Sequence, residues 1–139
     1  MEHSHLKFHH FGLAVRRPEE ARMLMLSLGY QLADYVFDPI QNVHLQMCFS
    51  TTQPAVEIIW PGATPGPVDK LVQRYPTGIV YHICYETENL AASIACLEKN
   101  CGLQPVCISR PAPALLFNGR KVSFYNVLGI GLIEILEQE

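Results

Sequence analysis

Two histidines and two glutamates occupy equivalent places in the two halves of the sequence. His10 and His82 each lie in a run of β-branched and aromatic residues, and Glu57 and Glu134 are each the single acid of an apolar run. A carboxylate in such a run is costly to bury unless a positive group meets it. Two imidazoles and two carboxylates that converge form a ligand set for divalent Zn, Co, Ni, Mn or Fe. The pattern therefore predicts one metal site, with coordination positions left for water or substrate.

Each of the four residues also has an ordinary structural interpretation. A histidine near the terminus can simply be exposed, His82 can be a hydrogen-bonded core residue, and either glutamate can face water on an edge strand. His9 competes with His10, because a shift of one residue in strand register exchanges the two faces of the strand. Aligning residues 11–12 with residues 83–84 favours His10. The order His, Glu, His, Glu at equivalent places in two repeats favours the shared metal site.

The elements that would position these residues repeat in the same order. In the first half we expect a strand, a helix that begins near Pro18 and stops at Gly29, and three more strands. The ranges are 8–15, 18–29, 31–37, 43–49 and 55–60, and in the second half 79–85, 87–102, 104–109, 121–127 and 131–136. This predicts an α+β chain that forms a single domain of two βαβββ modules. The first module spans 6–62, a linker with a short helix spans 63–77, and the second module spans 78–137.

Strand alternation suggests further candidates. In residues 43–49 the apolar side chains share one face with each other, while His44 and Gln46 share the opposite face with Cys48. We expect the apolar face to pack on the helices and the polar face to line the cavity. A neutral His44 could then act as a base near neutral pH, and Gln46 could orient a water or a carbonyl. In the second half the same alternation places Lys121, Ser123 and Tyr125 on one face of the strand 121–127, and Val122 and Phe124 on the other.

Composition excludes several classes of protein. The chain has 139 residues, 10 Lys and Arg against 13 Asp and Glu, and a net charge of -3, with no basic stripe for nucleic acid. No apolar run reaches the roughly 18 residues of a membrane span. Residues 1–10 lack the apolar core of a secretory signal, so we expect a cytoplasmic protein. The five cysteines are odd in number and form no C-x-x-C pair, which favours reduced thiols. A chain of this size folds without a metal, so a bound metal would serve chemistry.

Several segments together indicate a family. They are residues 9–15, 56–61, 77–83, 118–124 and 131–136, and the likeness extends from about residue 8 to about residue 137. The chain resembles the vicinal oxygen chelate superfamily of glyoxalase and bleomycin-resistance proteins, and most closely its methylmalonyl-CoA epimerase branch. The resemblance implies a cup-shaped mixed sheet around a divalent metal ion, with His10, Glu57, His82 and Glu134 on the ligand positions. It also implies a small-molecule substrate, such as an acyl-CoA or another thioester, and a homodimer.

The resemblance further implies an activity. Members of the epimerase branch are metal-dependent isomerases that remove the proton α to a thioester through a metal-stabilised enolate. Glu134 corresponds to one acid–base group of the branch. The other is a glutamate on the third strand of the first module, and residues 43–49 hold no acid. Two alternatives stay open: a glyoxalase I type lactoylglutathione lyase, which the ligand set permits equally, and a non-catalytic protein that binds or sequesters a small molecule.

Residues 109–117 are expected to form an irregular, mobile lid or rim.

Overall fold

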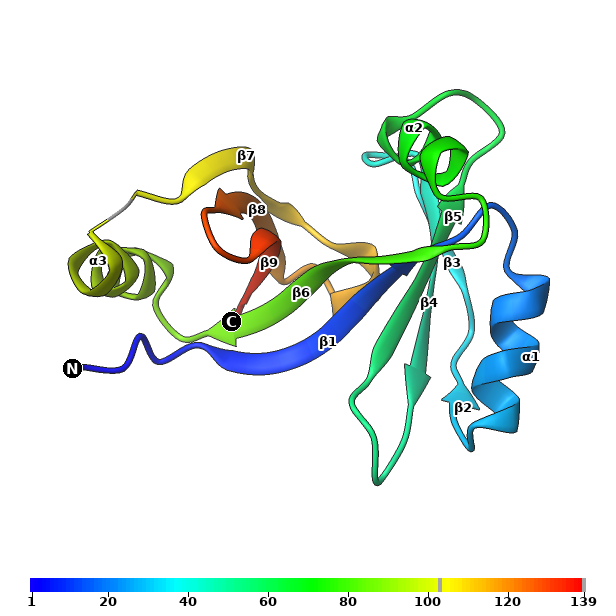
Figure 1. The fold of residues 1–139 in the computed structure, drawn as a ribbon, viewed down its shortest axis with the longest axis horizontal. Helices are drawn as coiled ribbons and strands as arrows, with labels where there is room; N and C mark the ends of the chain where they lie inside the picture. The colour runs from blue at the N-terminus through cyan, green and yellow to red at the C-terminus, as the bar shows by residue number, and fades with distance from the viewer. Residues whose placement is uncertain (103, 139) are drawn as a thin grey trace. The chain divides into compact units, whose positions relative to one another are not determined.

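The chain has a mixed α+β fold, seen in a computed structural model that describes residues 1–102 and 104–138 (Figure 1). Its elements are β1 (Lys7–Ala14), α1 (Glu19–Ser27), β2 (Gln31–Leu32), β3 (Val36–Asp38), β4 (Val43–Phe49), β5 (Val56–Pro61), α2 (Pro67–Arg74), β6 (Ile79–Thr87), α3 (Leu90–Cys101), β7 (Val106–Pro113), the 3₁₀ turn η1 (Leu115–Phe117), β8 (Lys121–Val127) and β9 (Gly131–Glu137). The order β, α, then further strands occurs twice, as predicted. Within the described part of the chain, no helix is long and apolar enough to cross a membrane.

The chain divides into two compact units, each containing one of the repeats. One unit is His10–Tyr81, and the other combines Met1–His9 with the chain from His82 onward. The boundaries fall inside β1 and inside β6.

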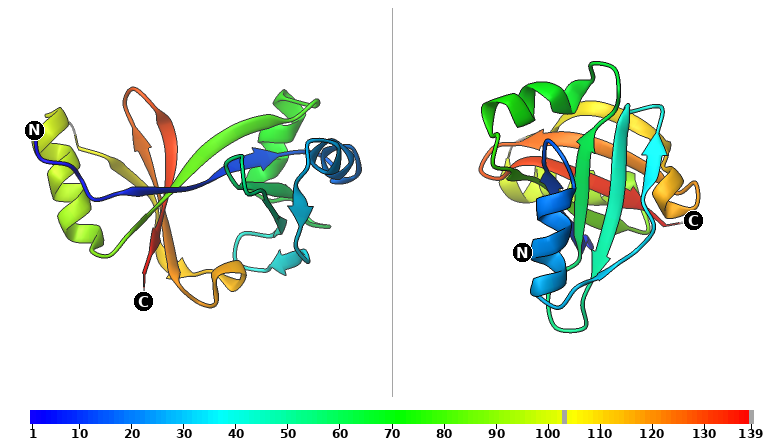
Figure 2. Two further views of the ribbon diagram at one scale, coloured as in Figure 1. Left: turned by 90° about the horizontal axis from the view of Figure 1, so that it is seen from below. Right: turned by 90° about the vertical axis from the view of Figure 1, so that its right-hand side faces the viewer.

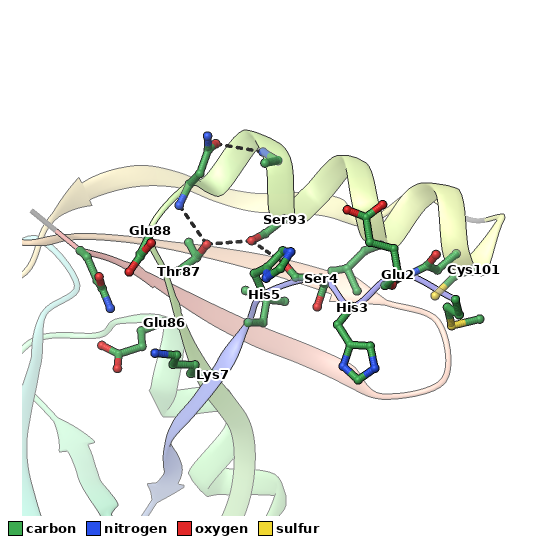
Figure 3. Close-up of a pocket in the computed structure, with 17 residues that line it drawn as sticks. Glu2, His3, Ser4, His5, Lys7, Glu86, Thr87, Glu88, Ser93 and Cys101 are labelled. Atoms are coloured by element: carbon green, nitrogen blue, oxygen red, sulfur yellow. Dashed lines mark hydrogen bonds between the residues drawn. The ribbon is translucent and has the colours of Figure 1, made fainter.

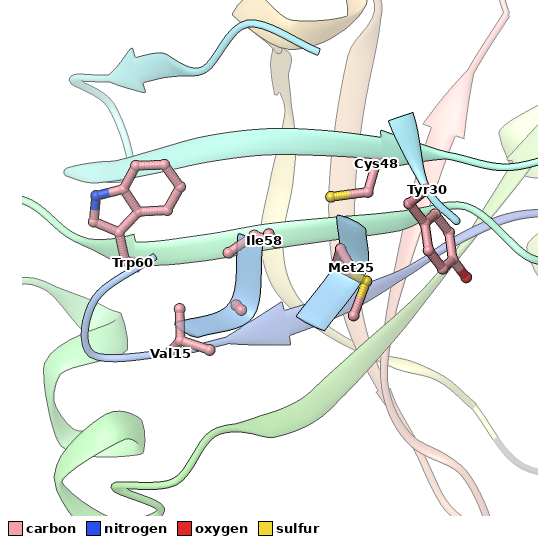
Figure 4. Close-up of a cluster of buried hydrophobic side chains, with 7 residues drawn as sticks. Val15, Met25, Tyr30, Cys48, Ile58 and Trp60 are labelled. Carbon is pink, nitrogen blue, oxygen red and sulfur yellow. The ribbon is translucent and has the colours of Figure 1, made fainter. Parts of the chain in front are cut away.

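The unit His10–Tyr81 holds its strands in the order β2-β4-β5-β1, and β3 also pairs with β4. β1 and β5 are parallel, and the other pairs are antiparallel. α1 lies alongside these strands (Figure 2). Its two buried residues enter a cluster with side chains from β4, β5 and the segments that follow β1 and α1 (Figure 4). The cluster contains Val15, Ala21, Met25, Tyr30, Cys48, Ile58 and Trp60. α1 therefore covers one face of this sheet.

The second unit holds its strands in the order β6-β9-β8-β7. β6 and β9 are parallel, while β8 is antiparallel to both of its neighbours. One face packs against α3 through Tyr125, Ile133 and Ile135, which meet Leu90 and Ile94. The opposite face carries a separate cluster of Cys84, Ala114, Val122 and Leu136. The arrangement repeats that of the first unit.

Two sequence-based expectations were wrong in detail. The strand expected at 31–37 is broken into β2 and β3. The segment 109–117, expected to be irregular, continues β7 as far as Pro113 and then forms η1. Proline lacks a backbone N–H and is tolerated in an edge strand, where that group has no ladder partner to lose. β7 is such an edge, because it ends the strand order of its unit.

Candidate metal centre

The unit His10–Tyr81 presents a buried histidine–glutamate pair. Gly12 of β1 is in register with Glu57 of β5, and His10 lies two residues before Gly12 on the same face. His10 Nε2 lies 3.6 Å from Glu57 Oε1, and the two side chains are 0% and 4% exposed. Ile58, the neighbour of Glu57, packs under α1. The pair therefore occupies the face of the sheet that α1 does not cover.

The second unit presents the equivalent pair. Cys84 of β6 is in register with Glu134 of β9, and His82 lies two residues before Cys84. His82 Nε2 lies 3.4 Å from Glu134 Oε1, and these side chains are 1% and 5% exposed. Phe124 of β8 is in register with Glu134, and its ring meets the His82 ring edge-on at 5.6 Å. This pair occupies the face opposite that packed on α3.

The two pairs are built in the same way. In each, the histidine comes from the first strand of a repeat and the glutamate from the last strand, and the two strands are parallel. In each, an imidazole Nε2 faces a carboxylate oxygen in a site from which water is almost excluded. One imidazole nitrogen and one carboxylate oxygen are donors that divalent zinc, nickel, cobalt, manganese and iron accept. The described residues therefore fit such an ion chemically.

The polar residues of β4 lie on the face opposite to the one predicted. Gln46 Oε1 accepts a hydrogen bond from Arg22 Nε of α1 at 2.7 Å, and Gln46 Nε2 donates to the Ala33 carbonyl oxygen at 2.8 Å. His44 stacks on Trp60, with ring centroids 5.3 Å apart and planes 15° apart. Both residues thus share the face that packs under α1. The prediction that this face lines the cavity was wrong, because α1 supplies an arginine that satisfies the buried amide.

The apolar residues of β4 take the face of the histidine–glutamate pair instead. Met47 is in register with Glu57, and Leu45 follows the same alternation. In the second unit Phe124 is in register with Glu134, whereas Tyr125 and Ile133 pack toward α3. Both faces are therefore reversed relative to the sequence-based expectation. Beside each pair, the adjacent strand contributes hydrophobic side chains.

Two further carboxylates on these faces were not singled out from the sequence. Asp38, opposite Val43 in the register of β3 and β4, is buried, and its Oδ1 accepts the N–H groups of Ile40 and Gln41 at 2.8 and 3.3 Å. Glu86 follows His82 and Cys84 in the alternation of β6, and its Oε2 accepts from Arg120 Nη2 at 3.0 Å. The i, i+2, i+4 spacing of residues 82, 84 and 86 could have revealed Glu86. Both carboxylates therefore accept hydrogen bonds from described residues.

A hollow of about 900 Å³ in the second unit lies away from the histidine–glutamate pair (Figure 3). The N-terminal segment runs along α3 there. Asn100 Nδ2 donates to the Glu2 carbonyl oxygen at 2.6 Å, and Ser93 Oγ donates to that of Ser4 at 2.9 Å. Neither member of the pair is among the described residues that line this hollow. Its location separates it from the candidate metal ligands.

Comparison with known proteins identifies the family. Residues 9–124 match the family model of the Glyoxalase/Bleomycin resistance protein/Dioxygenase superfamily. The chain belongs to this superfamily. The match spans most of the sequence and confirms the resemblance drawn from the motifs. No curated protein matches the chain.

Several solved structures share the fold of this chain. A hypothetical protein, BH1468 from Bacillus halodurans C-125, is 22% identical with a TM-score of 0.78, and the alignment covers 96% of this chain and 95% of that one. Methylmalonyl-CoA epimerase from Mycobacterium tuberculosis is 16% identical with a TM-score of 0.79, covering 100% and 93%. A Streptomyces coelicolor methylmalonyl-CoA epimerase variant in complex with 2-nitronate-propionyl-CoA is 17% identical with a TM-score of 0.72, covering 96% and 95%. These similarities confirm the glyoxalase-like fold.

Proposed function

We propose that the protein is a metal-dependent isomerase, similar to methylmalonyl-CoA epimerase, that moves a proton on the carbon next to a thioester carbonyl. The observation that carries the proposal is the pair of equivalent, buried histidine–glutamate contacts, one in each unit. In the proposal one divalent ion is held by His10, Glu57, His82 and Glu134. The ion would be zinc, cobalt, nickel, manganese or iron, whose preferences these donors satisfy.

The chemistry follows from the residue types. A divalent ion at such a site stabilises negative charge on a substrate oxygen, which makes the neighbouring C–H bond more acidic. His10 and His82 would bind the ion as neutral imidazoles. A carboxylate oxygen of Glu134 would take the proton from one face of the carbon. Inversion would require a proton delivered to the opposite face, and water would be its source, because Met47 and Leu45 occupy the pair-bearing face of β4.

The substrate class is supported by the similar structures. A Streptomyces coelicolor epimerase was solved with 2-nitronate-propionyl-CoA, and another structure holds methylmalonyl-CoA. An acyl-CoA or similar thioester is therefore the first substrate to test. The homodimer and the cytoplasmic location remain predictions.

A second candidate is a glyoxalase I type lactoylglutathione lyase. Inversion at carbon needs an acid or base on each face of the planar intermediate, whereas Met47 and Leu45 occupy the pair-bearing face of β4. Their apolar side chains favour a reaction in which one base moves a proton between adjacent carbons. His44 and Gln46 would then have only structural roles under α1.

One experiment distinguishes these functions. The metal-loaded protein is incubated in D₂O with methylmalonyl-CoA, or with methylglyoxal and glutathione, and the products are followed by NMR. We expect metal-dependent deuterium incorporation at the α-carbon, and Glu134→Gln should slow it by about 10²- to 10⁴-fold. The matched control Glu88→Gln, whose residue is exposed next to α3, should retain the wild-type rate.

Metal content is measured in each variant, since Glu134 is also a proposed ligand. Formation of lactoylglutathione without exchange into methylmalonyl-CoA would select the second candidate. Stoichiometric metal without turnover of either substrate would contradict both enzymes and favour a protein that binds or sequesters a small molecule.

A further inference from the structure

The turn η1 is a closed structure in the second unit. Phe117 N–H and Gly119 N–H both donate to the Ala114 carbonyl oxygen, at 3.2 and 2.9 Å, and Ala114 N–H donates to the Arg120 carbonyl oxygen at 3.0 Å. Asn118 and Gly119 have φ values of 55° and 79°, in the left-handed region, which reverses the chain into β8. The sequence predicted an irregular segment here, whereas the described backbone bonds close it into a turn.

An ion pair fixes the end of this turn. Arg120 Nη2 donates to Glu86 Oε2 at 3.0 Å, and Arg120 Nε donates to the Glu137 carbonyl oxygen at 2.9 Å. The side chains of Arg120 and Glu86 are about three-quarters buried. Partial burial and two anchoring bonds favour one fixed position for the turn.

The turn places Phe117 on the face that carries the His82–Glu134 pair. Phe117 and Phe124 both pack against the cluster of Cys84, Ala114, Val122 and Leu136. The Phe117 ring also meets the ring of His9 edge-on, with centroids 5.4 Å apart. Phe124 contacts His82, and Phe117 packs against the same cluster as Phe124, so this cluster forms an apolar wall that begins at the pair and extends to Phe117. Leu115, on the same turn, is 59% exposed.

We infer that Phe117 is a specificity-determining residue that limits the room for the apolar group next to a ligand's metal-binding oxygens. The inference rests on the proposed metal site. A fixed phenyl ring leaves space for a small substituent and excludes a large one, because packed side chains yield little. Phe117 is half-buried, so shortening it to alanine opens space in this wall that an aromatic ring can occupy. The substrate would thus carry a small aliphatic group beside its chelating oxygens.

The test uses Co²⁺-loaded full-length protein and two bidentate oxygen ligands, acetohydroxamate and benzohydroxamate. Their dissociation constants are measured from the visible absorption of the cobalt ion. We expect wild type to favour acetohydroxamate. Phe117→Ala should shift the affinity ratio toward benzohydroxamate by about tenfold, as expected for burying part of a phenyl ring. Leu115→Ala is the matched control and should leave the ratio within about twofold.

The possible outcomes separate the inference from the proposed function. Failure of wild type to bind Co²⁺ would contradict the metal site itself. Co²⁺ binding with an unchanged ratio in Phe117→Ala, or an equal change in Leu115→Ala, would overturn the role of Phe117 alone. Phe117→Leu serves if the alanine variant does not fold, and it should shift the ratio in the same direction by a smaller factor. An unchanged ratio in a folded Phe117→Leu would also overturn the inference.

Discussion

At the scale of single residues, burial sets the chemistry of Cys48. This thiol has no exposed surface, and burial raises its pKa from 9.0 to about 11, against an opposing effect of Arg22. The folded state holds the Cys48 proton more tightly than the unfolded state does. The protonated thiol therefore makes its full contribution to the free energy of unfolding below pH 9, and this contribution is lost as the pH rises from 9 through 11.

The prediction concerns the free energy of unfolding, measured with urea at pH 8 to 11. Between pH 9 and 11 the wild type should lose about 2 to 3 kcal/mol more than Cys48→Ala, which lacks the titrating group. The alanine variant starts from a lower stability because it leaves a small cavity, so the two slopes are compared. Parallel pH profiles would show that Cys48 ionises equally in both states.

At the scale of elements, α1 and β4 are tied together by Gln46. Replacing Gln46 with Ala removes the partners of Arg22 Nε and of the Ala33 carbonyl oxygen. We expect a loss of about 1 to 3 kcal/mol in unfolding free energy, since buried polar groups lose their hydrogen bonds. Metal stoichiometry should stay unchanged, and Gln31→Ala, at an exposed site on β2, should change neither quantity. Loss of metal binding without loss of stability would instead show that Gln46 contributes to the metal site.

The hydrogen bond between Arg22 and Gln46 also explains which features of β4 could be predicted from the sequence. Alternation correctly indicated that His44, Gln46 and Cys48 share a face, because the period of a strand is local. It could not indicate which face meets the helix. That choice depends on Arg22, which lies 24 residues from Gln46 in the chain and satisfies its amide. A buried polar face with a distant partner was therefore mistaken for a cavity wall.

The segment around the end of β7 is a second case in which local sequence could not reveal the structure. Residues 109–117, which contain two prolines, were expected to form an irregular lid or rim. β7 is an edge strand, however, and its pairing with β8 extends to Pro113. The position of a strand in the sheet is a property of the whole unit, so a local reading of proline cannot supply it. The closed turn that follows provides Phe117.

At the scale of the whole molecule, internal repetition is what made the histidine–glutamate pairs predictable. Each repeat places its histidine on the first strand and its glutamate on the last, and parallel pairing of these strands brings the two side chains together. A single repeat would have offered one histidine and one acid, for which an ordinary structural role is the better interpretation. The equivalence of two such pairs is what favours a shared function.

Whether the two pairs share one ion can be tested by the number of metal equivalents that the chain binds. If both pairs hold the same metal, the chain should bind one equivalent, and His10→Ala and His82→Ala should each weaken it strongly. If each pair held its own ion, two equivalents would bind, and each variant would keep one of them. At a free metal concentration of 100 times the dissociation constant, one ion adds about 2.7 kcal/mol to unfolding free energy. Titration with Zn²⁺, alongside the control His3→Ala at an exposed position, measures both quantities. Two independent equivalents would refute the shared centre, because neither histidine variant could then affect the ion held by the other repeat.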